Sequence, residues 1–423
     1  QKNPDISHVP NAIAYNEIKS NYNPTEIQFE QLPADHPLYI MFTSGTTGLP
    51  KCMVQSTGGI LIHHMKELLL HADLKREDRI FYFTTCGWMM WNWLTSSLSV
   101  GATLVLFDGN PFHPNPGALW KMAQDEKITI FGTSAGYIAA LQNAGVKPGK
   151  EYDLSALKAV MSTGSPLSEE GFEFIYDEVK SDLQLASISG GSDINGCFAG
   201  GNPMGPVYAG ELQCRQLAMK VEAFDPYGKP VINEQGELVC TAPAPCMPIY
   251  FWDDPKGERY HSAYFDVYPN IWRHGDYIEI NDRGGVVIYG RSDATLNPGG
   301  VRIGTAEIYR QVEQIPEIAD CLVVGQNWNN DVRVVLFVKM AEGHELTEDL
   351  KKQIKTTLRT HASPRHVPAK IIAIPDIPYT LNMKKVELAV KKTIEGQPVL
   401  NKDALSNPGA LDYYENIAEL NED

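Results

Sequence analysis

The sequence is poor in positive charge. Its 36 Lys and Arg residues are outnumbered by 52 Asp and Glu residues, so the formal net charge is −16. Phosphate backbones and anionic lipid surfaces repel such a chain unless it carries a concentrated basic stripe, and the sequence has none. Nucleic acids and membranes are therefore not expected partners. An anionic substrate must instead be bound by a few local cations or backbone N–H groups.

Cysteine motifs are also missing. The seven cysteines include no C-x-x-C pair, and their number is odd. Neither a zinc cluster nor a disulfide framework is expected from such a pattern. The sequence therefore predicts a protein of a reducing compartment, and we expect it in the cytoplasm.

No long hydrophobic run is present. The most apolar stretch, residues 87–107, is interrupted by Asn92, three hydroxyl residues and Gly101. It predicts a buried helix followed by a strand, not a membrane span. Residues 1–33 are polar and do not resemble a secretory signal. Because no initiator Met opens the chain, we expect it to begin within a longer protein.

The composition is that of a soluble globular protein, with 43% hydrophobic and 21% charged residues in a chain of 423, enough for two or three packed units. Short apolar runs alternate with helical patterns in the first half. This alternation predicts a largely parallel sheet covered by helices. Strands are expected at 38–42, 80–84, 102–107 and 128–131, and helices at 59–70, 119–125 and 169–180.

The sequence pattern changes from about residue 205. Short strands separated by Gly, Pro and Asp-rich turns predict a small β-rich subdomain, and the section from residue 293 has mixed α and β character. No internal repeat is present. The strands are expected at 220–224, 237–240, 286–289, 320–325 and 332–338, and the helices at 304–314 and 347–360.

A loop rich in glycine and hydroxyl residues follows the first expected strand directly. Glycines let the backbone approach an anion closely, while hydroxyls and a Lys donate to phosphate oxygens. The spacing is not that of a Walker A loop. A surface turn is the alternative reading. The loop consists of Thr43, Ser44, Gly45, Thr46, Thr47, Gly48, Leu49, Pro50 and Lys51.

This loop resembles, at every position, the phosphate loop of the adenylate-forming superfamily, which includes acyl-CoA synthetases, firefly luciferase and peptide-synthetase adenylation domains. The resemblance implies that the loop holds the β- and γ-phosphates of ATP. It also implies an α/β fold with three parts: an irregular lead-in over 1–37, a large domain over 38–292 that lacks its first part, and a mobile α+β domain over 293–423. The large domain would contain helix-flanked mixed sheets and the β-rich subdomain.

Two further segments resemble motifs of this superfamily in its order. Residues 162–166 resemble the adenine-side turn, with Ser165 in place of an acid. Residues 189–193 fall where the family places Thr-Glu, although alone they read as a Gly-Gly turn with an acidic end. The implied roles are ATP contacts by Gly164, Ser165, Pro166, Gly190 and Gly191, catalysis by Ser192 near the α-phosphate, and catalysis and Mg²⁺ coordination by Asp193.

Residues 272–276 resemble the family's ribose-binding motif, in which His274 replaces a hydroxyl residue and Asp276 would accept from both ribose hydroxyls. Residues 290–303 resemble its hinge motif. Taken singly, each segment is equally well explained as turn chemistry. The roles implied for the second motif are Arg291 at ribose or phosphate, Asp293 as the hinge, Arg302 at phosphate, and Gly299 and Gly300 along the CoA pantetheine arm.

The last motif ends at Lys384. The family's version implies that this Lys reaches the α-phosphate and the acid's carboxylate during adenylation. Met383 stands where the family has Gly, and Lys385 follows, so a shift of one residue is an alternative assignment. A solvated surface charge is the reading without the resemblance.

Residues 84–93, 296–302 and 364–368 resemble the acetoacetate-activating branch of the acyl-CoA synthetases. The resemblance implies that an acyl pocket is lined by Trp88, Met89, Met90, Thr163 and Gly190. Acetate-activating relatives have a Trp at the position of Gly190, so we expect the volume of an indole to be free for a longer acid. Trp88 and Asn92 are candidate donors to a ketone oxygen. Helix core is the alternative for part of this Trp/Met run.

Together these motifs imply a monomeric ligase that uses ATP, Mg²⁺ and CoA. It would convert acetoacetate to its adenylate with release of pyrophosphate, and then to acetoacetyl-CoA with release of AMP. Two alternatives remain: a synthetase for another short- or medium-chain acid, and a non-catalytic interaction protein that retained the fold. The departures at Ser165, Asp193, His274 and Met383 give the second alternative some weight, whereas the retained residues argue against it; these are Lys51, Asp276, Arg291 and Lys384.

Overall fold

The computed structural model describes residues 5–23, 25–42, 51–298, 301–329, 331–381, 384–399 and 402–422. The predicted residues 43–50 of the phosphate loop, Gly299 and Gly300, and Met383 lie outside these ranges. None of the helices in the described ranges is both long enough and apolar enough to span a bilayer.

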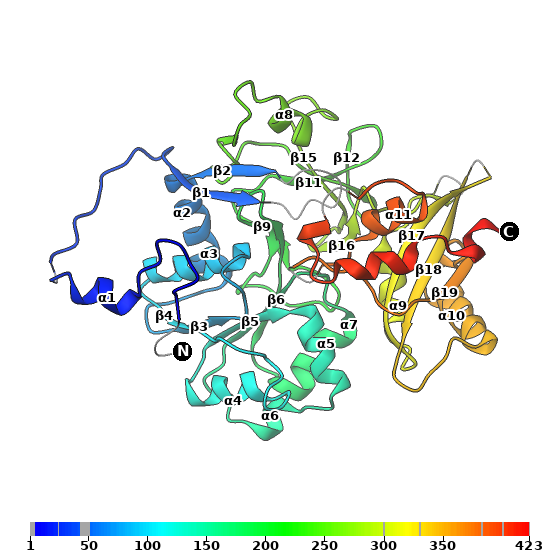
Figure 1. Cartoon of the computed structure of the whole chain (residues 1–423), viewed down its shortest axis with the longest axis horizontal. Helices are drawn as coiled ribbons and strands as arrows, with labels where there is room; N and C mark the ends of the chain where they lie inside the picture. Colours follow the sequence, from blue (N-terminus) through cyan, green and yellow to red (C-terminus); the bar gives the residue numbers. More distant parts are fainter. Residues whose placement is uncertain are drawn as a thin grey trace.

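A five-stranded sheet in the order β4-β3-β5-β6-β7 forms the centre of the first half (Figure 1), and every pairing in it is parallel. The predicted parallel sheet is therefore confirmed. β6 and β7 were not predicted. The strands are β3 (Arg79–Tyr82), β4 (Thr103–Val105), β5 (Ile130–Ser134), β6 (Ala159–Thr163) and β7 (Gln184–Ser187).

Helices cover both faces of this sheet because alternate strand residues are apolar on each face. Phe81, Phe131 and Val160 pack on one side with Trp120 of α4, and Ile80, Tyr82 and Ile130 pack on the other with Trp93 of α3. The helices of the first side are α4 (Ala118–Asp125), α5 (Ala135–Asn143) and α7 (Glu169–Phe174), and α7 continues as a π-helix, Ile175–Val179. Those of the second are α2 (Thr57–Lys66), which continues as a π-helix, Glu67–His71, and α3 (Met89–Ser96).

Antiparallel sheets make up the β-rich part. The larger has the order β12-β11-β13-β15-β16, and two three-stranded sheets have the orders β1-β2-β14 and β10-β9-β8. The larger contains β11 (Val221–Phe224), β12 (Pro230–Val231), β13 (Gln235–Cys240), β15 (Trp272–Ile280) and β16 (Val286–Arg291). The smaller contain β1 (Pro37–Phe42), β2 (Cys52–Ser56), β14 (Tyr250–Phe251), β8 (Ser189–Gly191), β9 (Gly196–Gly200) and β10 (Cys214–Arg215).

The last section forms its own sheet, in which β17 and β18 pair antiparallel and β19 joins β18 in parallel. Helices pack on both faces, over two separate apolar clusters. Figure 1 shows these elements together at one side of the molecule. They are β17 (Ile318–Trp328), β18 (Asp331–Met340), β19 (Lys370–Ala373), α9 (Thr305–Val312), α10 (Glu348–His361) and α11 (Glu387–Ile394). The predicted domain boundary at residue 293 stays a prediction.

Three short helices lie outside these layers. They are α1 (Tyr15–Ser20), which buries none of its residues, α6 (Pro148–Glu151) and α8 (Glu258–Tyr264). Only α8 contributes to the site described below.

The centre of the parallel sheet tolerates no side chain at Gly132 of β5. A Cβ atom there would lie 2.0 Å from the Tyr82 ring, and that ring is held by edge contacts with Trp88 and Trp93. We expect Gly132→Ala to lower the stability by about 1–3 kcal/mol, because overpacking forces neighbours out of place. Gly136→Ala in α5 is the control, since its Cβ would meet only Ser134 Oγ at 3.9 Å and Ala favours helix. A melting temperature of Gly132→Ala equal to that of Gly136→Ala would contradict this packing.

Candidate functional site

The cavity of the site opens where strands of the parallel sheet end. In parallel α/β sheets, crevices beyond the carboxyl ends of the strands are the usual place for ligands. The cavity is lined by segments that are far apart in the chain, including one from the last section. The lining residues are Trp88, Met89, Met90, Thr163, Gly164, Ile188, Gly190, Gly191, Ser192, Gly196, Cys197 and Lys384.

All five residues predicted for the acyl pocket line this cavity. Trp88 precedes α3, Met89 and Met90 begin it, Thr163 ends β6, and Gly190 belongs to β8. The candidate donor Asn92 instead directs its Nδ2 to Met41 Sδ, at 3.0 Å. The structure thus gathers the predicted pocket residues, with Lys384 beside them.

The prediction that Gly190 leaves the volume of an indole free is wrong. A Cβ atom built there would lie 1.8 Å from the carbonyl oxygen of Gly196 and 2.6 Å from Cys197 Cα. The side-chain direction at this position therefore points into the backbone of β9 and not into open space. β8 and β9 thus approach too closely at Gly190 to leave free volume for a side chain.

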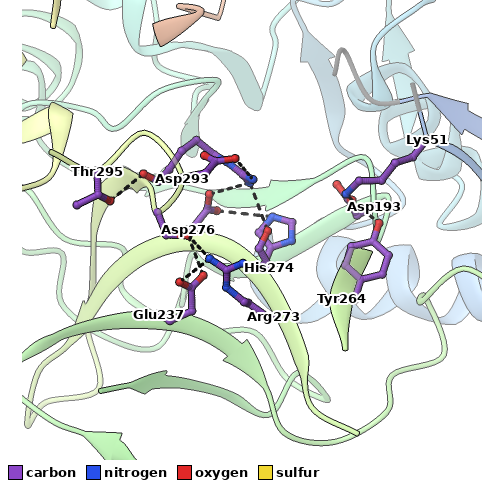
Figure 2. A network of polar contacts seen from close by, with 11 residues as sticks. Lys51, Asp193, Glu237, Tyr264, Arg273, His274, Asp276, Asp293 and Thr295 are labelled. Atoms are coloured by element: carbon purple, nitrogen blue, oxygen red, sulfur yellow. Dashed lines mark hydrogen bonds and ion pairs between the residues drawn. The ribbon is translucent and has the colours of Figure 1, made fainter. Parts of the chain in front are cut away.

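Asp193 lies just after β8 and is the most heavily contacted carboxylate of the site (Figure 2). Lys51 Nζ donates to its Oδ1 at 3.2 Å, and the Tyr264 hydroxyl donates to the same oxygen. Burial alone would raise the pKa of Asp193, but the Lys51 ammonium and the hydrogen bond from the Tyr264 hydroxyl outweigh it and hold the pKa well below its usual range. The carboxylate is therefore charged.

Tyr264, the last residue of α8, was missed by the sequence reasoning. Its ring stacks on Trp272 at 3.5 Å between centroids, and Lys51 Nζ lies 4.5 Å from the ring centroid. The residue thus contacts both predicted ATP-site charges, Lys51 and Asp193. It lies 71 positions from Asp193 in sequence, outside every motif, so only its place before the motif at 272–276 could have drawn attention to it.

Asp276 and Arg291 meet across the β15–β16 pair, where the two residues are register partners. Arg291 Nη1 lies 3.3 Å from Asp276 Oδ1, and His274 Nε2 lies 3.6 Å from Oδ2. Gly275 between them has φ of +90°, and a Cβ there would lie 2.7 Å from Arg291 Nη2. Glycine is required here by both its conformation and the close approach.

His274 lies between Asp276 and Asp193 (Figure 2), and its ring is buried against Phe198. Burial lowers the pKa of His274, although both carboxylates act in the opposite direction. A neutral imidazole is thus favoured at this position. It separates the two acidic groups without adding a charge.

The predicted hinge begins beside a second polar cluster. Ser292 Oγ donates to Glu237 Oε1 at 2.9 Å, and Arg273 Nη2 lies 3.2 Å from Glu237 Oε2. Burial raises the pKa of Glu237. Asp293 itself pairs with Arg291, with Nε and Oδ1 3.3 Å apart. Glu237 and Arg273 were not predicted as site residues. Their contacts hold the chain in place one residue before the predicted hinge.

Lys384 and Lys385 point to different places, and of the two only Lys384 lines the cavity. Lys385 Nζ pairs with Glu313 at 2.5 Å and Asp320 at 2.9 Å within the last section. Lys384 lines the cavity. Lys384 as a whole is an exposed residue, so its side chain is accessible from solvent as well as from the cavity.

The structure brings the remaining predicted site residues together less closely. Arg302 is exposed, with its guanidinium 5.7 Å from the Tyr277 ring centroid. Gly164, with φ of +95°, Ser165 and Pro166 form the turn after β6. The only described residue of the predicted phosphate loop is Lys51.

Asp193 offers one oxygen to a metal ion. Among the described residues, Oδ2 accepts no hydrogen bond, and no group of three His, Cys, Asp or Glu side chains could hold a metal alone. Mg²⁺ is usually bound by one or two carboxylates together with substrate phosphates and water. The donor set therefore fits a Mg²⁺ that arrives with a nucleotide, and does not fit a resident metal.

A sequence model of the family described as AMP-binding enzyme matches residues 4–251 of the chain. Acetoacetyl-coenzyme A synthetase of Rhizobium meliloti (strain 1021) is 58% identical over 93% of the chain and 60% of the relative. Acetoacetyl-CoA synthetase of Gallus gallus is 50% identical over 98% of the chain and 63% of the relative. The chain thus spans about three fifths of the length of these curated relatives.

Solved structures of similar proteins agree with these sequence matches. Acetoacetyl-CoA synthetase from Streptomyces lividans superposes with a TM-score of 0.90 at 48% identity, covering 95% of this chain and 62% of that one. The anthranilate CoA ligase AuaEII, solved with anthranoyl-AMP, has a TM-score of 0.77 at 19% identity, covering 90% of this chain and 71% of that one. The second likeness shows the fold alone. The predicted α/β architecture is confirmed.

The Tyr264 hydroxyl is expected to stabilise the site. Tyr264→Phe keeps the stacked ring but removes a hydrogen bond to a buried carboxylate, which is worth about 1.5–3 kcal/mol. Tyr260→Phe is the matched control, because Tyr260 packs in the same aromatic cluster and no described residue accepts from its hydroxyl. We expect thermal unfolding at lower temperature for Tyr264→Phe alone. Equal shifts for the two variants would count against the Asp193 contact.

Proposed function

Because the chain belongs to the AMP-binding enzyme family, we propose that it is an ATP-dependent ligase that joins acetoacetate to CoA through an acyl-adenylate. The observation that carries this proposal is the convergence of three cations on one cleft. Lys51 contacts Asp193, and Arg291 contacts Asp276. Lys384 from the last section lines the cavity together with Ser192, the residue before Asp193. The names of the two similar curated proteins support acetoacetate as the acid.

In the first step, a carboxylate oxygen of the acid attacks the α-phosphorus of ATP. The new acyl–phosphate bond forms as the bond to the β-phosphate oxygen breaks, and pyrophosphate leaves with its charge. The acid lies in the cavity beside Trp88 and Met89, and the Lys384 ammonium stabilises the charge that develops on the attacking and phosphoryl oxygens.

The other groups hold the nucleotide in place. Asp276 accepts from the ribose hydroxyls, Arg291 donates to ribose or phosphate, and the loop that ends at Lys51 binds the β- and γ-phosphates. Asp193 Oδ2 would hold Mg²⁺, which supplies charge neutralisation at the phosphates when bound. Ser192 contributes near the α-phosphate.

In the second step, the CoA thiol gives up its proton to solvent and its sulfur attacks the adenylate's carbonyl carbon, releasing AMP. This requires Lys384 to leave the cleft, and we propose that residues 293–423 rotate about Asp293 to withdraw it. The contacts of Ser292 with Glu237 support a pivot at that point, since they fix the residue before it. Such a rotation keeps the adenylate enclosed and protects it from water.

We also propose that the protein acts in the cytoplasm and as a monomer. No disulfide is found among the described residues, which supports a reducing compartment.

Pyrophosphate exchange with a panel of acids tests the substrate. With the full-length protein we expect the highest kcat/KM for acetoacetate, ahead of butyrate, 3-hydroxybutyrate and acetate. Discrimination between acids that differ by one methylene is expected to stay within about 10–200-fold, because apolar pockets distinguish such substrates weakly. Preference for another acid would replace acetoacetate in the proposal. Binding of ATP without exchange for any acid would contradict ligase activity.

Lys384→Ala tests the assignment of the two steps. We expect adenylation to fall about 100-fold or more, because a donor aimed at the transition state is lost. Transfer from supplied acetoacetyl-adenylate to CoA is expected to fall much less. Lys385→Ala is the matched control, since its ion pairs with Glu313 and Asp320 lie within the last section. It is expected to reduce stability and to preserve the adenylation rate per folded molecule.

Equal loss of both half-reactions in Lys384→Ala would refute its role. A loss of adenylation in Lys385→Ala as large as in Lys384→Ala would do the same.

A further inference from the structure

A buried carboxylate behind the cavity belongs to none of the motifs. Glu67 begins the π-helix that extends α2, and it is 2% exposed. Its Oε2 accepts from Trp93 Nε1 at 2.8 Å, and its Oε1 accepts from the backbone N–H of Cys197 at 2.8 Å. The two oxygens thus hold two separate elements, α3 and β9.

Both of these elements form walls of the cavity. Trp93 lies one helical turn after Met89 and Met90, which line it, and Cys197 lines it directly. Since side chains three and four positions apart share a helix face, a shift of Trp93 moves the two methionines with it. One carboxylate therefore joins two elements that both line the same cavity.

The side chains around Glu67 are closely packed. A Cβ at Gly196 would lie 2.2 Å from His63 Nε2 and 2.9 Å from Glu67 Oε1, so β9 rests directly on these side chains. His63 Nε2 and Lys66 Nζ lie 3.0 and 3.5 Å from Oε1. Burial would raise the pKa of Glu67, but His63 and Lys66 outweigh it, so the carboxylate stays charged.

We propose that Glu67 is a positioning residue that fixes the width of the acyl cavity through Trp93 and Cys197, and thereby sets the affinity for the carboxylic acid. This inference rests on the proposed function. Glu67 does not line the cavity and touches no reacting atom. Its effect is expected on the acid and not on ATP, whose proposed ligands Asp276 and Arg291 lie on β15 and β16.

Glu67→Gln tests the proposal without changing the side chain's size. Trp93 Nε1–H and the Cys197 backbone N–H donate to different oxygens of the carboxylate, so either orientation of the Gln amide sets its NH₂ group against one of these two donors. Loss of a hydrogen bond to a charged group at one wall is expected to raise the KM for acetoacetate about 10-fold or more. The KM for ATP is expected to stay close to that of the wild type.

Trp93→Phe is a second variant, which decides if Glu67→Gln does not fold. It removes the Nε1–H donor and keeps an aromatic ring, and we expect a smaller rise of the KM for the acid. Trp120→Phe is its matched control. Trp120 is fully buried on the opposite face of the same sheet, and its Nε1 has no hydrogen-bond partner. It loses the same volume and should change stability alone.

The measurement is steady-state pyrophosphate exchange with the full-length protein, with acid and ATP varied separately, beside melting temperatures. A fall of kcat that follows stability, with an unchanged KM for acetoacetate in Glu67→Gln and Trp93→Phe, would overturn the inference. So would a rise of that KM in Trp120→Phe as large as in Trp93→Phe. Absence of exchange by the wild type with every acid would overturn the proposed function, and this inference with it.

Discussion

The buried carboxylate of Asp193 is the interaction on which the site depends. A charge removed from water is costly unless it is paired and hydrogen-bonded. Here the partners come from two distant segments, Lys51 before β2 and Tyr264 at the end of α8. Neutral His274 on β15 lies between this carboxylate and Asp276. To satisfy this one group, the chain must bring the β1-β2-β14 sheet, the β8–β9 hairpin and α8 together. The site is therefore complete only when these segments are packed together.

The same logic explains how an acidic chain can bind anions. The overall charge of −16 repels a nucleotide, so the cations must be concentrated and aimed. Arg291 is held by Asp276 and Asp293, and Lys51 by Asp193 and the Tyr264 ring. Each cation is fixed by a neighbouring anion or ring before the ligand arrives. Such preorganisation costs nothing at the moment of reaction.

Glycine and a neutral ring keep this dense arrangement possible. Gly275 leaves room for Arg291, and Gly196 leaves room for His63 and Glu67. His274, whose pKa burial lowers, fills the space between two carboxylates without a charge. Small or neutral residues thus stand wherever charged groups approach one another. A side chain added at either glycine would meet a functional or buried polar group.

The sequence alone determined the parallel sheet, the family, and the order of the motifs, because these depend on local periodicity and on residues that are adjacent in the chain. It even placed five residues around the cavity that the structure brings together there. Tertiary structure decided three features that the local sequence pattern does not contain. Tyr264, which lies outside the motifs, completes the contacts of Asp193. Lys384 and not Lys385 lines the cavity, and Gly190 faces backbone and not free volume. The physical reason is the same in each case. Side-chain direction and close approach are set by contacts between segments many residues apart, and these contacts leave no periodic trace in the sequence.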